Sequence, residues 1–182
     1  YGRRVRREEL ENAGINVPVL ATVCAGPLPQ PGNWASRLER LGLDVITTGA
    51  LEDDPEAVAM AVEAVPFRPM MARAGAADVA DLVAAGARIV ATDGPVPPDA
   101  YAFRFDEAVV TPVAADRPAE NANDVARDVL AAAREERASA LWVAAPDLSA
   151  VPEDIVEAKL EAMCEGTRMA RLWLSKQQSD PD

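Results

Sequence analysis

The sequence predicts a mixed α/β fold, namely a compact or incomplete (β/α) TIM-type barrel with parallel strands. Short apolar runs alternate with segments of helical periodicity, as successive βα units do. Seven of the apolar runs have the length of strands, which is close to the eight of a closed TIM barrel. An open doubly wound sheet is the alternative, and it would place a ligand at a switch point in the strand order.

The expected elements follow one another without a long break. The expected strands cover residues 17–24, 44–48, 67–73, 88–92, 101–105, 108–113 and 140–144. The expected helices cover residues 34–41, 55–64, 76–85, 120–137 and 152–173. Asp53 and Asp54 precede Pro55, so their carboxylates can cap the second of these helices, whose first turn tolerates proline. In the last helix the apolar residues recur about every 3.6 residues, which predicts one buried face.

One domain is expected to span residues 17–174, with a basic segment at 1–16 before it and a polar tail at 175–182 after it. The basic segment contains Arg3, Arg4, Arg6 and Arg7. We interpret this run as a solvated helix start, and a docking arm for an acidic partner is the alternative.

Composition limits the partners that we expect. The net charge of -12 makes this an acidic protein that repels polyanions, so we expect neither nucleic acid nor an anionic membrane as a partner. No apolar run reaches the roughly 18 residues that cross a bilayer, and no signal-peptide pattern is present. Cys24 and Cys164 form no Cys-x-x-Cys pair, which fits a cytoplasmic protein. A small-molecule ligand, a protein partner and an oligomer all remain compatible with the sequence.

The chain contains no histidine. This excludes Ser-His-Asp and Cys-His mechanisms and every zinc site that needs an imidazole ligand. Lys159 lies on the last expected helix between Glu157 and Glu161, so we expect a solvated charge there and not a Schiff-base lysine.

Five residues near expected strand ends and loops are candidate ligand-binding residues, because the functional residues of a barrel gather at the C-terminal ends of its strands. Asp44, Asp93 and Asp147 can share one mouth and hold Mg²⁺ or act as acid and base, although turn and strand-end roles are the favoured alternative. Arg73 ends a strand, where its planar fork suits an anion or, equally, a rim ion pair. Trp34 follows a Gly- and Pro-rich loop and is either a ligand platform or a helix-start packing residue.

Three segments resemble one known family in the same order along the chain. Residues 25–31 read Ala-Gly-Pro-Leu-Pro-Gln-Pro, residues 41–50 read Leu-Gly-Leu-Asp-Val-Ile-Thr-Thr-Gly-Ala, and residues 141–149 read Leu-Trp-Val-Ala-Ala-Pro-Asp-Leu-Ser before a helix at 152–166. They are similar to the first-strand turn, the second strand and the closing strand, loop and helix of the cobalamin-independent methionine synthases. That superfamily also includes uroporphyrinogen decarboxylase. The resemblance implies descent from a TIM barrel and suggests a methyltransferase-like role in one-carbon metabolism, but it does not imply that methionine synthesis is preserved.

The departures from the family concern its metal chemistry. Leu148 stands where the family has a zinc-binding cysteine, the family's His-x-Cys pair is absent, and Thr48-Gly49-Ala50 replaces Asp-Gly-Glu. Zinc is therefore not expected, and no residue is identified as catalytic. The leading hypothesis is a zinc-free, methyltransferase-like barrel that binds a small organic ligand or a one-carbon carrier, folate or corrinoid, at its C-terminal mouth. The alternatives are a non-catalytic subunit or scaffold of a larger complex and a carboxylate-based lyase or isomerase.

Overall fold

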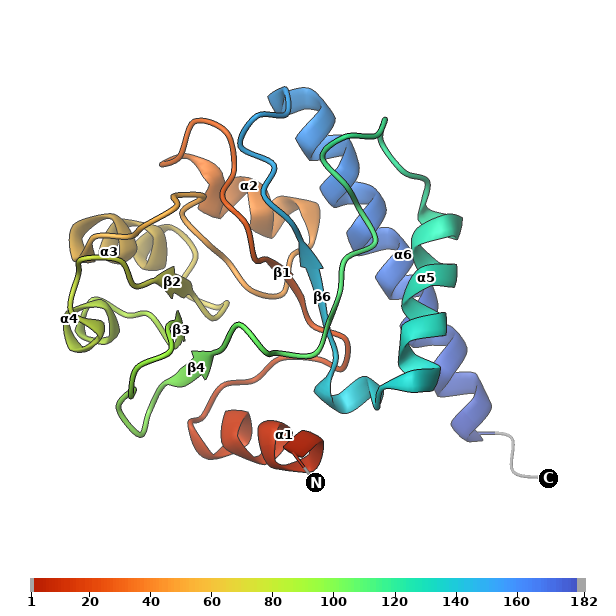
Figure 1. The fold of residues 1–182 in the computed structure, drawn as a ribbon, viewed down its shortest axis with the longest axis horizontal. Coiled ribbons are helices and arrows are strands. Elements are labelled where there is room, and N and C mark those ends of the chain that lie inside the picture. The colour runs from red at the N-terminus through yellow and green to blue at the C-terminus, as the bar shows by residue number, and fades with distance from the viewer. Residues whose placement is uncertain (1, 180–182) are drawn as a thin grey trace.

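The computed structural model describes the backbone of residues 2–179 and the side chains of residues 7–179. Its helices are α1 (Gly2–Asn12), α2 (Trp34–Leu41), α3 (Pro55–Ala64), α4 (Val79–Ala84), α5 (Ala122–Glu135), the 3-10 helix η1 (Ala138–Ala140) and α6 (Glu153–Ser179). Its strands are β1 (Thr22–Cys24), β2 (Met71–Arg73), β3 (Ile89–Ala91), β4 (Tyr101–Phe103), β5 (Val109–Val110) and β6 (Trp142–Ala145). Figure 1 shows their arrangement. The side chains of Arg3, Arg4 and Arg6, on which the docking-arm alternative rests, lie outside the described ones.

The prediction of a mixed α/β fold with parallel strands is confirmed. The strands form two three-stranded sheets, in the orders β1-β6-β5 and β2-β3-β4, and every pairing is parallel. The strand expected at 44–48 is reduced to one bridge, between Ile46 and Met70. Around it Val45 N donates to Thr22 O (3.1 Å) and Met71 N donates to Ile46 O (2.8 Å). Residues 45–46 therefore lie between β1 and β2 and join the two sheets.

Successive residues of the strands point to opposite faces, and each face has its own apolar cluster. We call the first the inner cluster; it takes residues from both sheets, namely Val23, Val45, Met71, Ile89, Tyr101 and Trp142. The alternate residues pack with the helices and include Cys24, Ile46, Ala72, Val90 and Val143. Because one cluster joins both sheets, the sheets curve around it.

Helix α1 covers the inner cluster at the N-terminal ends of the strands. Leu10 of α1 and Ala13 and Ile15 just after it belong to the inner cluster, so the segment expected to precede the domain packs directly on its core. Figure 1 shows α1 beside the starts of the strands, with β6 pointing away from it. We call the end of the molecule at the C-terminal ends of the strands the mouth.

Side chains bridge the gap between β4 and β5, where no backbone pairing occurs in the described part of the chain. The buried Glu107 accepts hydrogen bonds from Tyr101 Oη (2.8 Å) and Trp142 Nε1 (3.2 Å). The ring of Phe103 meets that of Trp142 edge-on at 5.3 Å between centroids. This cluster links β4 to β6 at the point where a five-residue connection is too short to hold a helix.

Several element ends differ from the expected ones for local reasons. Helix α4 begins at Val79 and not at residue 76, because the Asp78 carboxylate caps it by accepting from Ala80 N (2.9 Å). Helix α6 continues to Ser179, into the segment expected to be a polar tail. Asp54 caps α3 as expected, by accepting from Ala57 N (2.8 Å). None of the helices described is both long and apolar enough to cross a membrane.

Lys159 is fully buried, which contradicts the expected solvated charge. Its ammonium group donates to Pro118 O (3.0 Å) and to both carboxylate oxygens of Glu120 (3.1 and 3.0 Å). The neighbouring Glu157 and Glu161 do not predict this partner, because Glu120 belongs to the loop before α5 and not to the helix that carries Lys159. The ion pair fastens that loop to α6.

Breaking this pair should strongly destabilise the fold. Replacing Lys159 with methionine leaves the Glu120 carboxylate nearly buried without its cation, and we expect the free energy of unfolding to fall by about 3 kcal/mol. Urea denaturation followed by circular dichroism measures this value. The matched control is Arg168→Met on the same helix, whose exposed pair with Glu165 should contribute nothing measurable. Equal losses from the two variants would contradict the prediction.

Candidate functional site

Arg73 is the last residue of β2 and lies at the mouth. Met71 points to the inner cluster and Ala72 to the helices, so the alternation of the strand turns Arg73 inward again. One guanidinium N–H donates to Cys24 O at the end of β1 (3.2 Å). Because residues 45–46 lie between these strands, the Arg73 side chain crosses the end of that segment on its inner side.

Thr47 lies on the same inner face, two residues after Val45 of the inner cluster. Its side chain is only 3% exposed, and its hydroxyl has no hydrogen-bond partner among the described residues. A buried hydroxyl without a partner costs about 1 to 3 kcal/mol. Thr47 directly follows residues 45–46, which lie between β1 and β2, the two strands that the Arg73–Cys24 hydrogen bond connects.

Asp53 forms two hydrogen bonds with the backbone of Arg73. Its carboxylate, 5% exposed, accepts from Arg73 N (2.7 Å) and from the Thr48 hydroxyl, and Asp53 N donates to Arg73 O (3.0 Å). Burial raises the pKa of Asp53, and the hydrogen bonds from Thr48 and Arg73 oppose that increase. The residue that the sequence identifies only as a possible helix cap is thus the tether between the loop before α3 and the end of β2.

Asp147 is exposed at the edge of the mouth, just after β6. Its carboxylate accepts from Ser149 N (2.9 Å) and the Ser149 hydroxyl, and these bonds lower the pKa of Asp147, with a further contribution from the charge of Arg73. The loop after β1 packs tightly here. A Cβ at Gly26 would lie 2.2 Å from Asp147 N, so only glycine fits.

The Arg73 guanidinium is a half-buried cation that belongs to no ion pair of the described residues. Burial lowers the pKa of Arg73, whereas the charges of Asp53 and Asp147 act in the opposite direction. Arginine stays protonated in proteins, so the group keeps its charge and most of its N–H donors for an anion.

The other expected site residues do not join this group. Asp44 lies at the opposite, N-terminal end of the strands, where it accepts from Thr22 N (2.9 Å) and pairs with Arg171 (2.6 Å). This separates Asp44 from Asp147, so these two carboxylates do not share one mouth, and Asp44 has the strand-end position that the sequence favours. The reason is that Asp44 starts its strand segment, whereas Asp147 follows the end of β6.

Asp93 lies in an exposed turn, and Trp34 is buried in the core. Asp93 is exposed in the turn after β3, where Gly94 N donates to the Thr92 hydroxyl (3.1 Å). Trp34 is fully buried; its Nε1 donates to Pro29 O (2.6 Å) and the Arg37 guanidinium carbon lies 3.7 Å from its ring centroid. The Trp34 ring therefore packs within the core and does not line the mouth.

The residues of this chain do not fit the zinc of the resembling family. Leu148, at the expected thiolate position, is a fully buried apolar side chain. Burial raises the pKa of Cys164 to about 12 and that of Cys24 still further, so both thiols resist the deprotonation that zinc binding needs. Within the described part of the chain, no three His, Cys, Asp or Glu residues lie close enough together to hold a metal ion.

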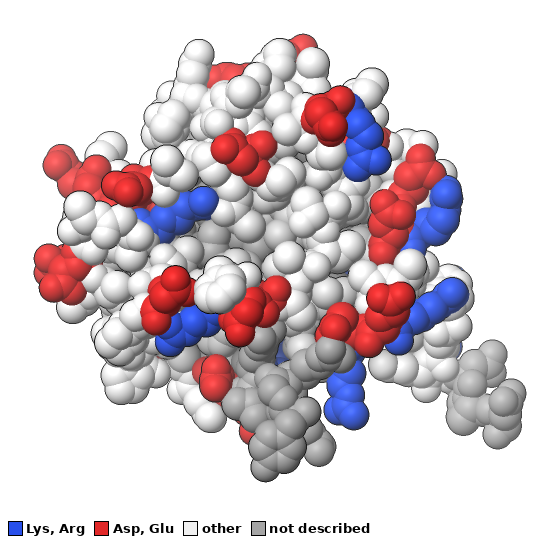
Figure 2. Space-filling view, in the orientation of Figure 1, with Lys and Arg blue, Asp and Glu red and all other residues white. Residues whose placement is uncertain are grey.

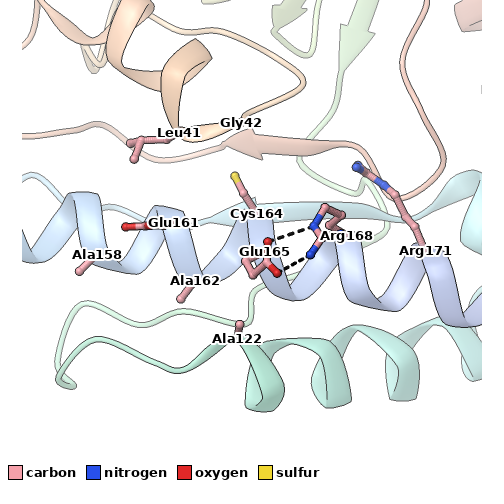
Figure 3. Close-up of a pocket in the computed structure, with 10 residues that line it drawn as sticks. All are labelled: Leu41, Gly42, Ala122, Ala158, Glu161, Ala162, Cys164, Glu165, Arg168 and Arg171. Carbon is pink, nitrogen blue, oxygen red and sulfur yellow. Dashed lines mark hydrogen bonds and ion pairs between the residues drawn. The ribbon is translucent and has the colours of Figure 1, made fainter.

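An open groove of about 600 Å³ lies away from the mouth, along the outer side of α6 (Figure 3). Both arginines that line it already have carboxylate partners, since Arg168 pairs with Glu165 and Arg171 pairs with Asp44. Small residues such as Ala158 and Ala162 form much of the rest. The groove therefore offers no cation that lacks a carboxylate partner, unlike the mouth.

Charges of both signs are mixed on the surface that Figure 2 shows. Acidic side chains lie mainly around the margin of this face, and several basic ones lie beside them, while uncharged residues occupy much of the middle. The described residues on this face form no continuous basic surface. The absence of a nucleic-acid partner stays a prediction from the net charge of -12.

Comparison with known proteins gives limited similarity. No family model matches the sequence, and no curated protein matches it. Among solved structures, the chain is similar to a B12-independent methionine synthase from Shewanella sp. W3-18-1 in complex with selenomethionine, with 16% sequence identity and a TM-score of 0.34. The match covers 80% of this chain and 53% of that one, so this chain spans about half of that enzyme's length.

The buried carboxylate of Asp53 should make stability depend on pH. Because its pKa is raised in the folded state, the folded protein takes up this proton before the unfolded chain does as the pH falls. We therefore expect the free energy of unfolding of the wild type to rise relative to that of Asp53→Asn as the pH falls from 7 towards the usual carboxylate range. Urea denaturation across this range measures the difference. Parallel pH profiles for the two proteins would contradict the assignment.

Proposed function

We propose that this chain is an incomplete (β/α) barrel that binds a small organic acid at its mouth through Arg73 and Thr47. The order of the hydrogen-bonded segments supports the barrel: β1, residues 45–46, β2, β3 and β4 follow in chain order, and β5 and β6 lead back to β1. The barrel is incomplete because β4 and β5 are joined by side chains and because helices are missing before and after β4.

Two observations carry the proposal: the half-buried Arg73 guanidinium belongs to no ion pair of the described residues and its bond to Cys24 O connects β2 to β1, and the buried Thr47 hydroxyl, on the segment between those strands, has no hydrogen-bond partner. The planar fork of arginine matches the two oxygens of a carboxylate, and Thr47 supplies a further hydrogen bond on the same inner face. An acid bound there relieves two costs of the folded chain at once: the half-buried charge of Arg73, which has no ion-pair partner among the described residues, and the unpaired Thr47 hydroxyl.

Apolar side chains near the mouth suit the rest of such a ligand. Leu51, just before the Asp53 loop, is 68% exposed, and Phe105, just after β4, is 91% exposed. Exposed large apolar side chains beside convergent polar groups are typical of ligand sites. The expected ligand is therefore an acid with an apolar body.

The sequence resemblance adds one-carbon carriers to the ligands worth testing. Folates carry two carboxylates at one end, of which Arg73 can bind one, and a flat heteroaromatic ring system at the other. Neither thiol is suited to activation, since burial raises the pKa of both Cys24 and Cys164. The proposal therefore concerns binding of the carrier, and methyl transfer would need an acceptor that is activated elsewhere.

Removing the charge of Arg73 should abolish most of the binding. In isothermal titration calorimetry, Arg73→Gln should weaken binding of benzoate or a folate at least about tenfold, because a charge-assisted hydrogen bond is lost. Thr47→Val should weaken it less, since a neutral hydrogen bond is lost. Benzamide, which has the shape of benzoate without its charge, and a corrinoid serve as comparison ligands in a thermal-shift screen.

The control variant for this experiment is Arg168→Gln, which removes an exposed arginine of α6 far from the mouth and should leave the affinity unchanged. If no carboxylate raises the melting temperature of the wild type, or if Arg73→Gln binds benzoate as well as the wild type does, the proposed site is wrong.

A further inference from the structure

We propose that Asp53 determines the selectivity of the mouth for ligand charge, so that the mouth binds singly charged carboxylates better than doubly charged ones. This inference rests on the proposed function. Asp53 acts as a positioning and specificity residue: its carboxylate accepts from Arg73 N, and it does not touch the ligand.

The hydrogen bonds of Asp53 exclude direct contact with the ligand as its main role. One carboxylate oxygen accepts from Arg73 N (2.7 Å) and the other from the Thr48 hydroxyl. Thr48 faces away from the inner cluster, since Ile46, two residues earlier, packs with the helices. The carboxylate thus lies on the helix side of the sheet, and the Arg73 guanidinium lies on the inner side.

The charges around the mouth favour a ligand that carries a single negative charge. The charges of two carboxylates, those of Asp53 and Asp147, act on the Arg73 guanidinium. Arg104, which follows β4, donates to Thr92 O (3.4 Å) and Gly94 O (3.0 Å) in the loop after β3. A first carboxylate of the ligand pairs with Arg73, whereas a second meets acidic groups and no available cation.

Burial makes Asp53 the more effective of the two acids. Asp147 is exposed, so water and salt screen its charge, but Asp53 is only 5% exposed and is screened much less. A unit charge several ångströms from the binding site, in surroundings of intermediate dielectric constant, changes the affinity for one further ligand charge by about tenfold. The selectivity between one and two charges should therefore depend mainly on Asp53.

The test compares two rigid acids of the same shape, para-carbamoylbenzoate with one charge and terephthalate with two. Calorimetry at pH 7.5 gives the ratio of their dissociation constants for each protein. The wild type should prefer para-carbamoylbenzoate, and Asp53→Asn should reduce that preference about tenfold, mainly by tighter binding of terephthalate. Asparagine keeps both contacts, because its amide oxygen can accept from Arg73 N while its amide group donates to the Thr48 hydroxyl.

The neighbouring residue provides the matched control. Asp54→Asn removes an equal charge from the next position, which is exposed, and asparagine still caps α3. Its preference should equal that of the wild type. Asp53→Ser, which removes the charge with a smaller side chain, is the second variant if Asp53→Asn fails to fold.

The outcomes separate this inference from the proposed function. If the wild type binds both acids and the ratio is the same in the Asp53 variants, Asp53 has no role in selectivity, although the binding site stands. If the wild type binds neither acid, the binding site and this inference are both wrong.

Discussion

The backbone hydrogen bonds of residues 45 and 46 are the constraint on which the rest of the structure depends. Val45 N bonds to Thr22 O, Ile46 N to Pro69 O and Met71 N to Ile46 O, so a single short segment joins two three-stranded sheets. These bonds fix the alternation of side chains across both sheets. As a consequence Val45 faces the inner cluster, and the Arg73 side chain can reach Cys24 O across the same segment.

Buried polar groups fasten the parts of the molecule that regular pairing leaves open. Glu107 connects Tyr101 and Trp142 across the gap between β4 and β5, and Lys159 connects α6 to the loop before α5 through Glu120. Such groups are stable in a low dielectric only when they have partners, which is why each makes several hydrogen bonds. At the mouth the Thr47 hydroxyl departs from this rule within the described chain, and this departure marks the proposed site.

The proposed site combines an inward cation with a buried acid behind it. Arg73 supplies the attraction for a carboxylate, and Asp53 both tethers the Arg73 backbone and limits how much negative charge the mouth accepts. This chemistry does not depend on a metal ion. It is compatible with the prediction of a zinc-free site from the sequence, with Leu148 buried at the position where a thiolate was expected.

The sequence by itself determined the mixed α/β class, the parallel strands, the bounds of α2 and α3, and the place of Arg73 at a strand end, because periodicity and capping are local properties. Only the tertiary structure decided which strand ends meet. It separated Asp44 from Asp147, gave Asp53 the backbone of Arg73 as its partner, and buried Lys159 against Glu120. Each of these contacts joins residues at least 20 positions apart, and no local pattern specifies such a pair. The sequence could have predicted that Thr47 points inward, because it follows Val45 by two residues in an alternating segment. Its lack of a hydrogen-bond partner depends on the packing of the whole mouth.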